Sequence, residues 1–171
     1  IIKFLNLNPF VIAGLRSLFA TIPILVYALF TKTRLIFSKK AIISSIFFCA
    51  TFLCFVASNK LTTAANAIVL QYTTPAFIAI ISALFLKKKI SGLDKITIIL
   101  TMFGIILFFI DKIDAGKALG NIVAIVAGIT LAIMFLICGE IPKKERLAGV
   151  LLGHSLTAVV GIPFIFVTEN T

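Results

Sequence analysis

Acidic side chains are scarce in this sequence. Its 171 residues include 6 Asp and Glu against 16 Lys and Arg. Every carboxylate falls in a loop or at the end of an apolar run, so the sequence gives no support for a carboxylate-based proton relay within those runs. The six are Asp94, Asp111, Asp114, Glu140, Glu145 and Glu169.

Histidine and cysteine are rare as well. His154 is the single histidine, and Cys49, Cys54 and Cys138 all lie inside apolar runs. Their spacing supports neither a disulfide framework nor a Cys-x-x-Cys metal site. We therefore expect the cysteines to be small buried apolar residues, and we predict no catalytic residue, no metal and no cofactor.

Apolar residues dominate what remains. They make up 61% of the chain, with a mean hydropathy of +1.20, well above the roughly half-apolar usage of soluble domains. A bilayer core needs about 20 consecutive apolar helical residues. Six runs reach or approach that length, so we predict an all-α, polytopic membrane bundle with helices at residues 10–30, 41–58, 64–86, 93–110, 121–138 and 147–167.

The positive charges gather in alternate connectors. Lys and Arg are retained on the cytoplasmic side of a membrane, so the connectors after the first, third and fifth predicted helices should be cytoplasmic and both chain ends external. Basic connectors held on the cytoplasmic side of a lipid bilayer explain the net charge of +10, so we expect no nucleic-acid partner. The cytoplasmic set is Lys32, Arg34, Lys39, Lys40, Lys87, Lys88, Lys89, Lys95, Lys143, Lys144 and Arg146.

Rows of small residues mark faces where helices approach closely in lipid. Ala124, Gly128 and Ala132 recur at four-residue spacing, and Gly149 and Gly153 form a Gly-x-x-x-Gly pair. We predict that both rows pack against neighbouring helices. The Gly pair has an alternative role as the interface of a homodimer.

Polar groups inside the predicted helices are candidates for a substrate cavity, because burying them in lipid costs free energy. Arg16 either snorkels or packs between helices, or it supplies a counter-charge in a cavity. His154 either moves a proton or donates a hydrogen bond to a nearby carbonyl.

The third predicted helix carries the densest polar set. Pro75 removes a backbone donor and should kink this helix, freeing carbonyls near Gln71 that need a protein interior or a wet cavity. Secondary transporters tend to bind substrate at such broken helices. The alternative is hydrogen bonding between helices alone. The cavity candidates here are Asn66, Gln71, Tyr72, Thr74 and Pro75.

Two segments echo one another. Residues 16–20 (Arg-Ser-Leu-Phe-Ala) match residues 154–158 (His-Ser-Leu-Thr-Ala), and Pro23 and Pro163 follow them. The two helices are predicted to run in opposite directions, as an inverted repeat requires.

Several segments together resemble the EamA-type family of the drug/metabolite transporter superfamily. They are residues 8–10 with 15–16, residues 61–67 leading to Pro75, Gly104, and residues 120–122 continuing through residues 127–128 to Ala132. The resemblance implies ten helices in two inverted five-helix repeats. Residues 1–117 would then supply most of the first repeat and residues 118–171 the start of the second, with one helix before the chain and three after it.

The function that this resemblance implies is secondary transport. We expect a protein that moves a small metabolite or drug across a bacterial cytoplasmic membrane by alternating access. The alternatives are a non-transporting membrane helper protein and, with less support, an intramembrane enzyme.

Overall fold

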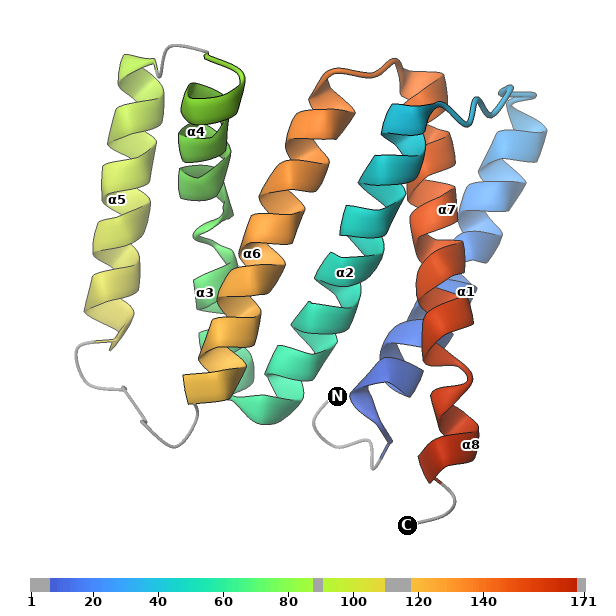
Figure 1. Cartoon of the computed structure of the whole chain (residues 1–171), viewed down its shortest axis with the longest axis horizontal. Helices are drawn as coiled ribbons and strands as arrows, with labels where there is room; N and C mark the ends of the chain where they lie inside the picture. The colour runs from blue at the N-terminus through green and yellow to red at the C-terminus, as the bar shows by residue number, and fades with distance from the viewer. Residues whose placement is uncertain (1–6, 88–90, 110–117, 169–171) are drawn as a thin grey trace.

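The computed structural model describes residues 7–87, 91–109 and 118–168, and every regular element in those ranges is a helix (Figure 1). Within those ranges, five stretches are long and apolar enough to cross a bilayer: residues Pro9–Phe30, Lys39–Leu61, Ala64–Phe85, Ala118–Gly139 and Lys143–Phe166. The helices are α1 (Pro9–Phe30), α2 (Lys39–Leu61), α3 (Ala64–Gln71), α4 (Thr74–Phe85), α5 (Gly92–Phe109), α6 (Ala118–Gly139), α7 (Lys143–Gly161) and α8 (Phe164–Thr168).

The helices stand side by side, and successive spans run in opposite directions (Figure 1). The α2–α6 pair forms the centre of the bundle. On one side α7 packs on α2, and α1 packs on both of them; on the other side α3 and α4 pack on α6, and α5 lies beyond α4. The central pair therefore separates two wings, α1–α7 and α3–α4.

Local sequence signals set the helix starts. Asn8 accepts a hydrogen bond from the Phe10 amide at 3.0 Å just before Pro9, and the Ser38 and Thr63 hydroxyls accept from the backbone at the starts of α2 and α3. Such caps satisfy amides that have no partner within the helix. Ser38 also donates a hydrogen bond to the Glu145 carboxylate on α7, so this cap ties two helices together.

Two predicted helices are interrupted by proline. The third is divided into α3 and α4 around Pro75, which confirms the predicted break. The sixth was predicted to be continuous over residues 147–167, and this is wrong in detail: α7 ends at Gly161 and α8 begins at Phe164, because Pro163 has no N–H to continue the ladder. Pro23, by contrast, lies inside an unbroken α1.

The fourth predicted helix is present as α5, the shortest of the long helices at 18 residues. It is not among the five candidate spans, and the predicted last residue, Ile110, lies outside the described residues.

The outer surface is strongly apolar. Phe19, Leu29, Phe30, Ile99 and Leu100 each expose more than half of their surface, and many other large apolar side chains do the same. Water would penalise such a surface by about 25 cal/mol for each Å². A hydrocarbon surround removes that penalty.

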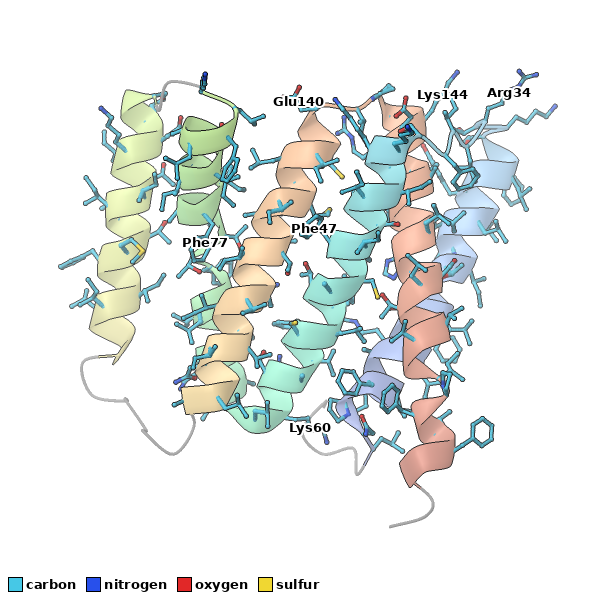
Figure 2. All side chains as sticks on the ribbon, viewed as in Figure 1. Arg34, Phe47, Lys60, Phe77, Glu140 and Lys144 are labelled. Atoms are coloured by element: carbon cyan, nitrogen blue, oxygen red, sulfur yellow. The ribbon has the colours of Figure 1, made fainter. Side chains whose placement is uncertain are left out.

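Charged groups gather at the ends of the helices (Figure 2). Arg34, Glu140 and Lys144 lie at one end and Lys60 at the other. We call these the lysine-rich end and the Lys60 end. The lysine-rich end holds the start of α2, with Lys39 and Lys40, and the start of α7.

Candidate functional site

The break between α3 and α4 is held by threonine hydroxyls. Pro75 cannot donate to the carbonyl of Gln71, and the Thr74 hydroxyl donates to that carbonyl instead, at 2.6 Å. The same hydroxyl lies 3.2 Å from the Gly128 carbonyl of α6, and Thr73 donates to the Leu70 carbonyl at 2.6 Å. The freed backbone groups are thus satisfied inside the protein, as membrane burial demands.

Gly128 permits this arrangement. A Cβ at this position would lie 3.2 Å from the Thr73 hydroxyl and 3.5 Å from both the Gln71 carbonyl and the Thr74 hydroxyl. The small-residue row of α6, Ala124, Gly128 and Ala132, therefore lies directly against the break. Ala124 and Ala132 are fully buried.

A depression of about 350 Å³ opens beside the break. Gln71 and Tyr72 contribute its polar side chains, and Phe55, Ile68 and Leu131 contribute its apolar ones. Tyr72 exposes 64% of its surface. Amide, phenol and aromatic groups together can bind a small organic molecule through hydrogen bonds and apolar contact.

Asn66 takes part in a different network. It is 3% exposed, and its amide lies 3.4 Å from the Thr62 hydroxyl, which in turn donates to Asn121 of α6 at 2.8 Å. A Cβ on Gly120 would lie 2.7 Å from the backbone of Thr62, so α6 begins in close contact with this turn. Asn66 thus joins α2, α3 and α6 and is not among the residues that line the depression.

A second polar group lies in the other wing. The Arg16 guanidinium of α1 lies over the Phe52 ring of α2, with its carbon 5.2 Å from the ring centroid. His154 of α7 meets Phe52 and Phe48 edge-on, at centroid distances of 5.3 and 4.7 Å, and Phe48 and Phe52 stack on one another at 4.7 Å. Aromatic rings attract a cation at their face, so this packing holds Arg16 beside His154.

Arg16 and His154 therefore come together, although they are far apart in sequence. Gln71, Tyr72, Thr74 and Pro75 come together in the α3–α4 wing. At 1.5 Å per residue, Arg16, Phe52 and Tyr72 lie about 10–14 Å from the Lys60 end of their helices, so the two groups occupy a similar depth.

The phenylalanines of α2 are functional candidates that the sequence reasoning missed. Phe48, Phe52 and Phe55 recur at four- and three-residue spacing, which places them on one side of a helix. Phe52 contacts Arg16 and His154, and Phe55 lines the depression. That spacing is visible in the sequence, but in an apolar helix it is also what lipid contact produces.

Glycines set the approach of α7 to its neighbours. A Cβ on Gly149 would lie 2.6 Å from the Ser44 hydroxyl, and a Cβ on Gly153 would lie 2.6 Å from the Phe48 ring. Both glycines therefore face α2 of the same chain. Gly14 and Gly161, which the sequence reasoning did not single out, bring the backbones of α1 and α7 together.

The described residues contain no group of three or more His, Cys, Asp and Glu side chains able to hold a metal ion. Cys49 and Cys138 are buried and Cys54 is half-buried.

An all-helical bundle with five membrane-length apolar segments, an apolar exterior and charged ends is a multi-pass membrane protein. The model of the EamA-like transporter family matches residues 1–110, and the chain belongs to this family. It is a family of transporters and not of enzymes. No curated protein and no solved structure matches the chain.

Proposed function

We propose that this protein is a secondary transporter that moves a small metabolite or drug across the cytoplasmic membrane by alternating access. The observation that carries this proposal is the break between α3 and α4, where polar side chains border a depression about a third of the way along the span from the Lys60 end. Membership of the transporter family supports the same conclusion.

In this proposal Gln71 and Tyr72 bind the substrate through their side chains, while Phe55 provides an apolar wall. The Thr74 hydroxyl and Pro75 keep the helix open at that point. At residues 72–73 two threonine hydroxyls, of Thr73 and Thr74, bond the carbonyls that end α3, so side chains carry part of the hydrogen bonding between α3 and α4. Such a joint is a suitable hinge for a change of access.

We further propose that residues 1–117 form most of a first repeat and residues 118–171 the start of a second. The antiparallel packing of α1 on α7 supports this, because these helices carry the echoed segments at residues 16–20 and 154–158. We also assign the lysine-rich end to the cytoplasm.

The test is solute counterflow in proteoliposomes that contain the full-length protein, with a panel of labelled amino acids, nucleosides and organic acids. We expect Tyr72→Phe and Gln71→Leu to reduce counterflow of the transported solute at least about tenfold, since each removes a hydrogen bond made to the substrate. The matched control is Tyr27→Phe, because Tyr27 is the other of the 2 tyrosines and lies at the far end of α1. Wild-type counterflow by both depression variants at normal protein levels would refute the site assignment.

A further inference from the structure

In the part of the chain that the structure describes, no carboxylate lies near Arg16. Arginine stays protonated in proteins and offers five N–H donors. Among the described residues the carboxylates are Asp94, Glu140 and Glu145, which lie in the first turn of α5, just after α6, and in the first turn of α7. All three are therefore at the lysine-rich end (Figure 1). Arg16 is the eighth residue of α1, so at 1.5 Å per residue it lies about 10 Å from the Lys60 end.

His154 adds an unused hydrogen-bonding atom. Its side chain is 8% exposed, and its Nδ1 has no hydrogen-bond partner among the described residues. The hydroxyl of Ser17, the residue after Arg16, is also buried, and it too has no partner within the described ranges. Buried polar atoms are nearly always paired, so each exception needs an explanation, and a bound ligand is one.

The geometry points to a binding site for the carboxylate of an organic substrate, formed by Arg16 and His154 against Phe52. This inference rests on the proposed transport function, and it names the substrate class. A carboxylate pairs with guanidinium through two parallel hydrogen bonds, and a second acceptor direction remains for an imidazole N–H. The rings of Phe48 and Phe52 then provide apolar contact for the body of the substrate.

The charge balance favours a carboxylate over a phosphate ester. Arg16 supplies one permanent positive charge, which one carboxylate neutralises. A phosphate monoester carries about 1.5 to 2 negative charges at neutral pH, which leaves charge uncompensated at membrane depth.

The test measures thermal stability of the purified full-length protein in detergent against matched pairs of acids and amides. The probes are acetate, hexanoate, benzoate and phenylacetate, each with its neutral amide, and phenyl phosphate as a separate arm. A ligand that binds only the folded state raises the melting temperature with its concentration. We expect at least one carboxylate to raise it while its amide does not.

Variants assign the effect to the site. We expect Arg16→Gln to weaken apparent carboxylate affinity by a factor of about 10 to 100, because a charged hydrogen bond contributes roughly 1.5–3 kcal/mol. Arg16→Lys should retain part of the affinity, and His154→Leu should reduce it. The matched control is Arg34→Gln, which removes the same charge from an exposed connector.

Three outcomes would overturn the inference: equal shifts by acids and amides, carboxylate shifts that survive in Arg16→Gln, or no shift with any carboxylate. The last is expected if a carboxylate elsewhere in the protein pairs with Arg16. An Arg16-dependent shift with phenyl phosphate alone would replace the carboxylate by a phosphate. Counterflow separates the two proposals: Arg16-dependent binding without counterflow refutes transport only, and counterflow of a neutral solute unchanged in Arg16→Gln refutes the carboxylate site only.

Discussion

Adding a single methyl group at Gly161 should separate α1 from α7. A Cβ at this position would lie 2.8 Å from the Gly14 Cα and 2.9 Å from the Gly14 amide nitrogen, and it would come still closer to the Phe10 carbonyl oxygen. All three are backbone atoms, so no side chain can rotate away. Ordinary contact begins at 3.4 Å. Relieving the Gly14 contacts alone requires a movement of about 0.6 Å, and relieving the closer contact with the Phe10 carbonyl requires the helices to move apart by about 1 Å.

The expected cost follows from two opposing effects. Overpacking a close contact costs about 1–3 kcal/mol, and the rigid neighbours place Gly161→Ala toward the upper part of that range. Alanine recovers about 0.5–1 kcal/mol relative to glycine by restricting the unfolded chain. We therefore expect Gly161→Ala to lower the free energy of unfolding by about 2 kcal/mol.

The matched control is Gly104→Ala on α5, where a Cβ would meet nothing within 4 Å. Alanine restricts the unfolded chain here as well, but it meets no neighbouring atom. This variant should therefore be as stable as the wild type or more stable by up to about 1 kcal/mol. The assay is SDS-induced unfolding of the full-length protein followed by far-UV circular dichroism, since this chain contains no tryptophan. If Gly161→Ala proved as stable as Gly104→Ala, the close contact of α1 and α7 would be wrong.

Three further predictions use the same assay. Thr74→Val should cost about 1–3 kcal/mol, because it removes the hydroxyl that donates to the partly buried Gln71 carbonyl; an unchanged midpoint would contradict this account of the break. A double-mutant cycle of Thr62→Val and Asn121→Leu should give a coupling energy of about 0.6 kcal/mol, and additivity would show that their hydrogen bond contributes nothing. Lys32→Gly should stabilise the protein by about 1 kcal/mol, because Lys32 has a φ of 48°; a loss of stability would refute the backbone strain.

Much of the topology follows from local sequence. The apolar runs are long enough to cross a bilayer, so five of the predicted spans appear as membrane-length helices with only small changes at their ends. The break near Gln71 is also a local effect, because proline has no backbone N–H to donate, whatever surrounds it. Pro163 acts in the same way on α7, whereas Pro23 remains within α1, so a proline in the sequence does not by itself settle whether the helix ends.

Other features depend on which way each helix faces. Nothing local in α1 or α7 indicates that Arg16 and His154 lie beside the same ring of Phe52, or that Gly14 meets Gly161. Likewise, the polar residues of the third span look equivalent in the sequence, yet Asn66 joins a buried network while Gln71 and Tyr72 border the depression.

The sequence by itself thus determined the class of protein, its apolar spans and the point where one of them breaks, because these depend on length, hydropathy and backbone chemistry. The tertiary structure alone decided which side chains meet, because in a helix that is apolar all round the hydrophobic pattern does not specify a face. Close packing at glycines and a few interhelical hydrogen bonds choose the rotation of each helix, and so they select the partners of Arg16, His154 and Tyr72.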